Sequence, residues 1–304
     1  MSTNYCFLTV GKTSQSTEST LSKRYIGLAS SYIKAVNPDK KTLDSIMGYE
    51  SQNEPEYVKE DDNGKMALIT FIVETDPEKN NDIDLKSRMT FILRNTPAYN
   101  RDKTKVQVID IYGNSTWANV EDAKEGKKLL SASGKELRIA SKYRMACVGE
   151  ADLVSFLKEY LGVGSSFNYI NGSWVLKDNA DDYLFSLEHV KDYFSGNVSE
   201  IKDAIKLQPN NKIKLLFGVR NTDNGQYQTI ATRDGLFLRN SAGEKAVARL
   251  EKTLEDAKNN GAFSTTEFKV QELQEFSVNP TDLSSKQSSD PLNSVEASDD
   301  NPWA

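Results

Sequence analysis

Cysteine, histidine and long apolar runs are all scarce in this sequence of 304 residues. Cys6 and Cys147 are the two cysteines and His189 is the single histidine, so counting excludes a disulfide framework, a zinc finger and a haem-attachment motif. No apolar run approaches the ~18 residues that a transmembrane helix needs. The first residues, MSTNYCFLTV, lack the basic start of a secretory signal. We therefore expect a cytoplasmic protein with reduced thiols.

Catalytic motifs are equally scarce. Gly11-Lys12-Thr13 resembles the end of a phosphate-binding loop, but position 6 holds cysteine where that loop requires glycine. His189 lies in a segment with helical pattern and has no persuasive Ser-His-Asp set around it. The neighbouring carboxylates of Asp61-Asp62 and Asp181-Asp182 point apart on a strand or helix. We expect no enzymatic activity, no cofactor and no metal site, and a nucleic-acid enzyme stays open as an alternative.

Charge is distributed unevenly along the chain. The formal net charge is -6, which by itself argues against a nucleic-acid partner. Residues 86–144, however, hold 13 basic and 6 acidic side chains, a net of +7. Residues 1–85 carry a net of -5, residues 145–278 a net of -4, and residues 279–304 a net of -4. A cationic centre followed by an anionic tail predicts an anionic ligand, with ordinary solvated surface as the alternative.

Apolar runs rich in β-branched residues predict short strands linked by turns. The strands are expected over residues 25–36, 66–75, 85–94 and 135–144, with hairpins around Gly113-Asn114 and Asp223-Asn224-Gly225. An apolar repeat at helical spacing predicts a helix over residues 150–161, and weaker patterns predict helices over 181–194, 199–207 and 243–259. The fold class is α+β and mainly β, which favours a small antiparallel barrel with added helices and hairpins.

Aromatic residues are interleaved with the cations of the central segment. Single-stranded nucleic acid is held by a cationic groove along the phosphates and by aromatic rings that stack on bases. Tyr99 lies in a polar loop, and Trp117 follows the Gly113-Asn114 turn within a few residues of Tyr112. The alternative is that Trp117 and Tyr112 pack inside the barrel. The predicted nucleic-acid-binding residues are Arg94, Tyr99, Arg101, Lys103, Lys105, Tyr112, Trp117, Arg138, Lys142, Tyr143 and Arg144.

Residues 279–304 are acidic and show no periodicity, which is typical of disorder. They end in the sequence SDDNPWA. Such an arm can cover a cationic groove until phosphates displace it, and can then dock to a basic, apolar pocket on a partner. The predicted partner-binding residues are Asp299, Asp300, Pro302 and Trp303.

These features resemble a known family. The tail is similar to the C-termini of bacterial and phage single-stranded DNA-binding proteins, with Trp303 in place of the usual phenylalanine and Ala304 added. The body resembles single-stranded DNA-binding proteins of crAss-like tailed bacteriophages. The patches that carry the resemblance are KRYIGLAS with AVNP (23–38), GYESQNEPEYV (48–58), KVQVIDIYGNSTWA (105–118) and YRMACVGEADLVSFLKEYLGV (143–163).

The resemblance implies an OB-fold core and a non-enzymatic protein that coats replication or recombination intermediates. It implies an OB-fold-like nucleic-acid-binding domain over residues 1–164, an α+β extension of the core over 165–278 and a disordered acidic tail over 279–304. The implied partners are single-stranded DNA and phage polymerase, helicase or primase, in the cytoplasm of the infected host bacterium, with no membrane partner. A phage structural or virion cargo protein is the second hypothesis.

Overall fold

The computed structural model describes residues 22–110, 113–129, 143–161, 167–170, 173–176, 179–186, 207, 210–222, 225–263 and 266–278. The strands are β1 (Ser22–Val36), β2 (Val58–Asp61), β3 (Gly64–Thr75), β4 (Lys86–Pro97), β5 (Lys105–Asp110), β6 (Ser115–Asn119), β7 (Tyr143–Met145), β8 (Cys147–Val148), β9 (Phe167–Ile170), β10 (Ser173–Leu176), β11 (Asn179–Ser186), β12 (Lys212–Thr222), β13 (Gly225–Ile230), β14 (Phe237–Arg239), β15 (Thr266–Phe268) and β16 (Gln274–Val278). The helices are α1 (Lys40–Met47), α2 (Val120–Lys124), α3 (Glu150–Tyr160) and α6 (Glu244–Asn259), with a 3-10 turn η1 (Pro77–Lys79).

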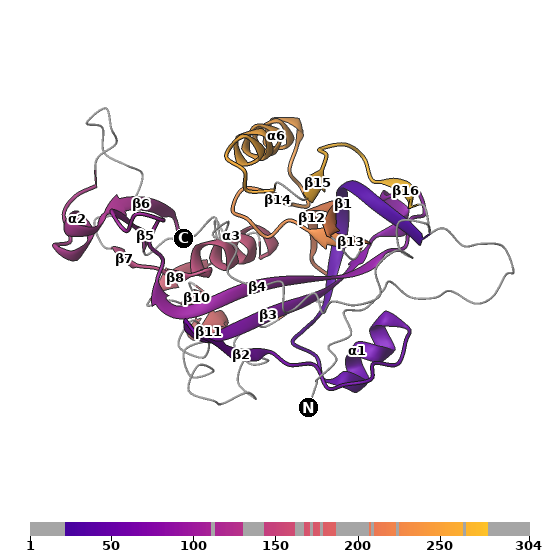
Figure 1. Cartoon of the computed structure of the whole chain (residues 1–304), viewed down its shortest axis with the longest axis horizontal. Coiled ribbons are helices and arrows are strands. Elements are labelled where there is room, and N and C mark those ends of the chain that lie inside the picture. Colours follow the sequence, from indigo (N-terminus) through magenta and orange to yellow (C-terminus); the bar gives the residue numbers. More distant parts are fainter. Residues whose placement is uncertain are drawn as a thin grey trace, which may run out of the picture.

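The fold is mainly β, and its largest sheet is antiparallel and curls into a half-barrel (Figure 1). The strand order is β13-β12-β1-β3-β4-β8, with β14 and β15 added to β12, β16 to β1 and β2 to β3. Strand β12 pairs with β1 in the register Gly27↔Phe217 to Tyr32↔Lys212. Strands from both halves of the sequence therefore complete one sheet.

Strand β1 changes partner at Gly27, and glycine is required there. Residues before Gly27 pair with β16, and residues from Gly27 onward pair with β12. Gly27 has φ of +143°, and a Cβ at this position would lie 2.8 Å from the Glu272 carbonyl oxygen. Only a residue without a side chain fits such a close approach of two backbones.

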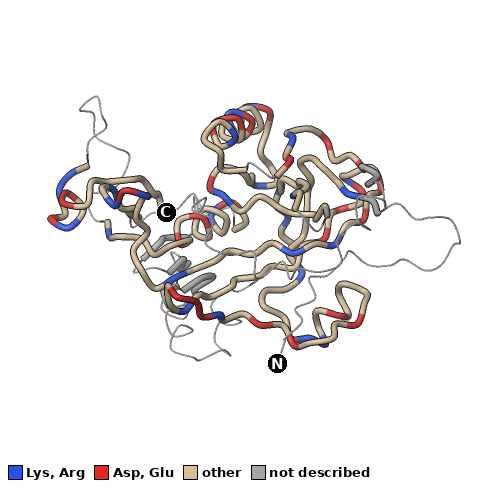
Figure 2. The backbone as a smooth tube through the Cα atoms, in the orientation of Figure 1, with Lys and Arg blue, Asp and Glu red and all other residues tan. Residues whose placement is uncertain are grey.

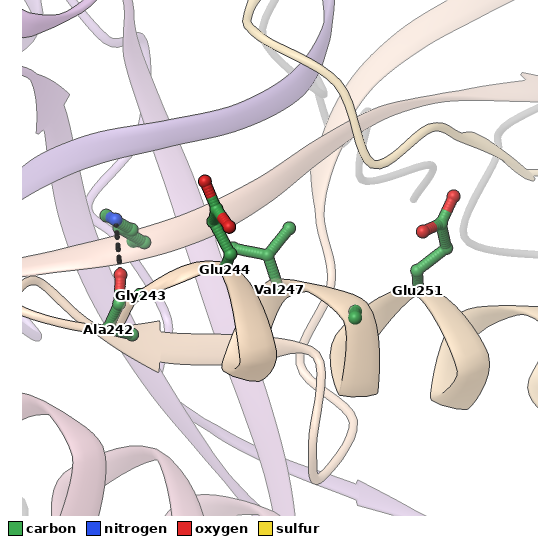
Figure 3. Close-up of a pocket in the computed structure, with 7 residues that line it drawn as sticks. Ala242, Gly243, Glu244, Val247 and Glu251 are labelled. Atoms are coloured by element: carbon green, nitrogen blue, oxygen red, sulfur yellow. Dashed lines mark hydrogen bonds between the residues drawn. The ribbon is translucent and has the colours of Figure 1, made fainter.

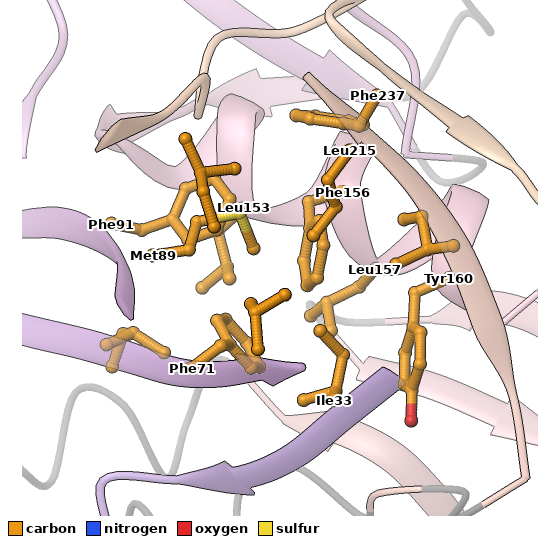
Figure 4. Packing of buried hydrophobic residues seen from close by; sticks show 14 of the residues in the cluster. Ile33, Phe71, Met89, Phe91, Leu153, Phe156, Leu157, Tyr160, Leu215 and Phe237 are labelled. Atoms are coloured by element: carbon orange, nitrogen blue, oxygen red, sulfur yellow. The ribbon is translucent and has the colours of Figure 1, made fainter. Parts of the chain in front are cut away.

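The main core lies on the concave side of the sheet, beneath α3. The buried residues Ile69, Phe71 and Val73 alternate along β3 and face the helix side. The ring of Phe156 in α3 contacts Phe71 of β3 and Phe237 of β14 (Figure 4). Its centroid lies 4.9 Å from that of Phe71 and 5.6 Å from that of Phe237. The apolar stripe of the sequence thus becomes the packing face of α3.

A second, small sheet projects from the end of β4 (Figure 1). Its strand order is β6-β5-β7, and α2 follows β6. The predicted hairpin is confirmed, because β5 and β6 pair from Lys105↔Asn119 to Ile109↔Ser115 and Gly113 has a φ of +70°. Of the described residues that the sequence assigns to nucleic-acid binding, this sheet carries Lys105, Trp117, Tyr143 and Arg144, and the loop before β5 carries Tyr99, Arg101 and Lys103.

Several other local predictions can be compared with the structure. The helices expected over 150–161 and 243–259 are confirmed as α3 and α6. The helix expected over 181–194 is wrong where the structure describes that segment, because residues up to Ser186 form strand β11. Tyr183 and Phe185 of β11 pair with Val175 and Trp174 of β10, so cross-strand pairing overrides a weak helical pattern. Nearly all of the strand expected over 135–144 and of the helix expected over 199–207 lies outside the described residues.

Helix α1 is an element that the sequence pattern missed. Pro38 ends β1, the Asp39 side chain accepts a hydrogen bond from the Thr42 N–H at 2.8 Å, and Gly48 ends the helix in a left-handed conformation. These are ordinary start and stop signals in a segment too short to show periodicity. Within the described part of the chain, no helix has the length and apolar character to cross a membrane.

Candidate functional site

The small sheet has two different faces, and its register assigns each residue to one of them. Val106 and Val108 of β5 are buried with Ala118 and Leu129 on one face, which we call the inner face. Residues between them on β5 point the opposite way, toward the outer face. Ile109 of that outer face is buried in the main core, so the sheet is anchored to the half-barrel on this side.

Tyr99 and Tyr143 belong to the inner face. Tyr99 forms a β-bridge with Val106, and Tyr143 is opposite Asp110 on β5. Both rings are partly buried against the small core. The Tyr143 hydroxyl donates hydrogen bonds to the carbonyl oxygens of Asp122 and Lys127, and burial raises the pKa of this phenol. Tyr143 therefore fastens the α2 segment to the sheet.

Trp117 belongs to the outer face. It pairs with Gln107 of β5, and the neighbouring pair on this face is Lys105 with Asn119. Trp117 is partly exposed and is a member of none of the hydrophobic clusters formed by the described residues. Within the described chain its indole makes no hydrogen bond and no ring contact. Hydrophobic clustering among the described residues therefore does not account for this tryptophan.

The basic turn, residues 100–105, connects the end of β4 to β5 and is tightly organised. The Asn100 side chain accepts from the Lys105 N–H at 2.7 Å, and the Asp102 carboxylate accepts from the Thr104 N–H and hydroxyl. Lys103 adopts a left-handed φ of +56° in this turn. Arg101, Lys103 and Lys105 are exposed, and none has a carboxylate within ion-pair distance among the described residues. The turn presents three free cations on an ordered backbone.

Two of the predicted arginines are engaged with carboxylates. Both terminal nitrogens of Arg94 in β4 donate hydrogen bonds to the Asp61 carboxylate, with Nη1 lying 2.8 Å from Oδ1. Arg144 of β7 donates to both oxygens of Glu150, whose side chain is fully buried at the start of α3. Glu150 also accepts from the Cys147 N–H. Arg144 thus joins the small sheet to α3.

Lys124 of α2 and Lys127, just after this helix, are also neutralised locally. Lys124 lies 3.8 Å from Glu121, and Lys127 lies 2.7 Å from Glu125. The Glu125 carboxylate raises the pKa of Lys127. Basic and acidic residues accordingly mix around α2 (Figure 2). Among the described residues of the predicted site, the positive charge that no carboxylate neutralises therefore lies at the basic turn. The carboxylates Asp61 and Glu150, which neutralise Arg94 and Arg144, were not identified from the sequence.

The remaining predicted residues lie outside the described part of the chain. These are Tyr112, Arg138 and Lys142 of the central segment and Asp299, Asp300, Pro302 and Trp303 of the tail. Among those described, the structure places Lys105 and Trp117 on the same face of the small sheet, and Arg101 and Lys103 in the basic turn that leads into β5. It places Tyr99 and Tyr143 on the opposite face.

The structure also contains an open groove at the start of α6 (Figure 3). It has a volume of about 500 Å³ and lies between β12 and the first turns of the helix. Its lysine, Lys214, donates to the Ala242 carbonyl oxygen at 2.9 Å, and the acidic residues Glu244 and Glu251 line the same groove. This charge arrangement does not favour an anion. The described residues include no group of three or more His, Cys, Asp or Glu side chains that could hold a metal ion.

In comparisons with known proteins, no family model, no curated protein and no solved structure matches this chain.

Proposed function

We propose that the chain binds single-stranded DNA through the outer face of the small sheet and the basic turn. The observation that carries the proposal is Trp117, which is partly exposed, belongs to no hydrophobic cluster among the described residues and lies on the same face as Lys105, which has no ion-pair partner among them. A base stacked on a tryptophan gains about 1 to 3 kcal/mol. Lys105, Lys103 and Arg101 supply the cations for the phosphates on either side of that base.

The same proposal includes the finer fold and the biological setting. We propose that the half-barrel is an OB-fold, with the small sheet as an elaboration between β4 and α3. The antiparallel curled sheet and the family resemblance of residues 23–38, 48–58, 105–118 and 143–163 support this interpretation. The protein would coat phage replication or recombination intermediates in the cytoplasm of the host bacterium, without catalysing a reaction. The acidic tail would tune affinity and recruit polymerase, helicase or primase.

A titration with labelled oligo-dT and with a duplex of the same length tests this function. We expect anisotropy to rise with the single strand, tryptophan fluorescence to be quenched, and affinity to fall steeply with salt because counterions are released. Equal affinity for the duplex would contradict the stacking role of Trp117. Absence of binding at low salt would contradict the whole proposal and favour the virion-protein hypothesis. Deleting residues 279–304 should tighten binding, because that segment carries a net charge of -4.

A further inference from the structure

Two of the predicted binding arginines form pairs with carboxylates, and the two pairs differ in one decisive respect. Glu150, the partner of Arg144, is fully buried. Separating this pair would leave a buried charge without its counter-charge, which is strongly unfavourable. The side chains of Arg94 and Asp61 are 18 % and 38 % exposed. Water and ions therefore reach the Arg94–Asp61 pair, and a pair in such a position contributes little to folding stability.

The position of Arg94 connects it to the basic turn. Strand β4 continues from Arg94 through Pro97 and Ala98 to the turn that carries Arg101. The two arginines are seven positions apart in the sequence, so an extended chain places their Cα atoms at most about 23 Å apart. A single strand of nucleic acid bound at the basic turn can therefore bring another of its phosphates, a few nucleotides away, to Arg94.

Asp61 imitates the contact that such a phosphate makes. It lies at the end of β2, in the turn to β3, and presents two oxygens to the two terminal nitrogens of Arg94. A phosphate diester offers the same pair of oxygens to a guanidinium. Arg94 Nη1 also donates to the Gly64 carbonyl oxygen at 3.3 Å, which helps to keep the side chain in place when Asp61 leaves.

We propose that Asp61 is a built-in competitor that occupies the phosphate site of Arg94 until single-stranded DNA displaces it. This inference rests on the proposed function and adds a regulation of the same interface. The carboxylate is covalently part of the β2–β3 hairpin, so its local concentration at Arg94 is high. Its effect is to lower affinity for short or weakly held strands, which cannot engage the basic turn and Arg94 together.

The experiment compares Asp61→Asn with Asp62→Asn in the full-length protein. Asp62 is exposed, adjacent, and forms no ion pair within the described residues, so its substitution removes the same charge without touching Arg94. With fluorescein-labelled oligo-dT, we expect Asp61→Asn to bind about two- to fivefold more tightly than the wild type, and Asp62→Asn to change little. The gain should vanish when Asp61→Asn is combined with Arg94→Gln.

Each outcome of this comparison decides the inference. Equal affinities for the two single variants, or a gain that persists without Arg94, would show that Asp61 acts only through bulk charge and would overturn it. If the wild type fails to bind oligo-dT at all, the proposed function fails and this inference falls with it. Thermal unfolding of each variant shows whether it is folded, and Asp61→Ser gives a second removal of the carboxylate with the same expected gain.

Discussion

Tyr99 and Trp117 lie on opposite faces of the small sheet, because their strand partners Val106 and Gln107 are consecutive residues of β5. Side chains of consecutive strand residues point to opposite sides. The two rings therefore cannot form a single stacking platform, although both lie within twenty residues of the same basic turn. We therefore expect Trp117 to contribute to DNA binding and Tyr99 to contribute to the stability of the small sheet.

Replacing Trp117 by alanine should weaken the binding of oligo-dT. The expected loss is about 1 to 3 kcal/mol, the contribution of one stacked base. Thermal stability should change little, because Trp117 belongs to no hydrophobic cluster among the described residues. Anisotropy of a labelled oligonucleotide measures the affinity without using tryptophan fluorescence, and Trp117→Phe, which keeps an aromatic ring, should retain part of it. Wild-type affinity in Trp117→Ala would contradict the stacking role.

Replacing Tyr99 by alanine should have the opposite profile. Its ring packs against Val106 and the small core, so the substitution leaves a cavity under the sheet. We expect a lower unfolding temperature, with oligo-dT affinity almost unchanged at a temperature where the protein stays folded. Denaturation followed by circular dichroism, next to the titration, separates the two effects. A Tyr99→Ala variant that keeps its stability and loses affinity would require Tyr99 to contact DNA directly.

Neutralising Arg101, Lys103 and Lys105 together should change the salt dependence of binding. Each phosphate contact contributes about 0.7 to the slope of log K against log salt for a single strand, so the triple glutamine variant should lose about 2 from that slope. The matched control neutralises Lys124 and Lys127, which are already paired with Glu121 and Glu125. If both variants change the slope equally, the positive charge of this region acts diffusely and the basic turn has no special role.

Local signals in the sequence predicted local structure well. The Gly113-Asn114 hairpin and helix α3 follow from turn chemistry and from an apolar repeat, both of which act over a few residues. The predicted list of binding residues could not separate free from neutralised cations, since Arg94 meets Asp61 across 33 residues of sequence. Nor could it separate Tyr99 from Trp117, because their faces depend on strand register, and register is set by pairing between segments.

Removing the positive charge of Arg144 should destabilise the fold. Arg144→Met removes the positive charge that neutralises the buried carboxylate of Glu150, and breaking a buried ion pair in this way costs about 3 kcal/mol. Because Arg144 itself is partly exposed, we expect the lower part of the usual range. Urea unfolding measures the loss. The double variant Arg144→Met with Glu150→Met should recover much of it, and equal instability of the single and double variants would mean that the carboxylate is not the cause.

Asp152 should make stability depend on pH. It lies in the first turn of α3, is 8 % exposed, and accepts a hydrogen bond from the Asp234 N–H at 2.7 Å. Burial raises the pKa of this carboxyl from 3.8 to about 7, against the opposing effects of that hydrogen bond and of Arg233. The folded state therefore holds a proton that the unfolded chain releases near pH 3.8.

The sign of the pH effect follows from this difference. Stability from Asp152 is fully present below about pH 4 and is lost as the pH rises to about 7, by a few kcal/mol in total. Asp152→Asn keeps the oxygen that accepts from Asp234 and removes the charge. It should therefore be more stable than the wild type at about pH 8 and nearly equal to it at about pH 4. Urea unfolding at both pH values, with Asp62→Asn as an exposed control, measures the change. A difference between Asp152→Asn and the wild type that stays constant with pH would mean that Asp152 ionises as readily in the folded protein as in the unfolded chain.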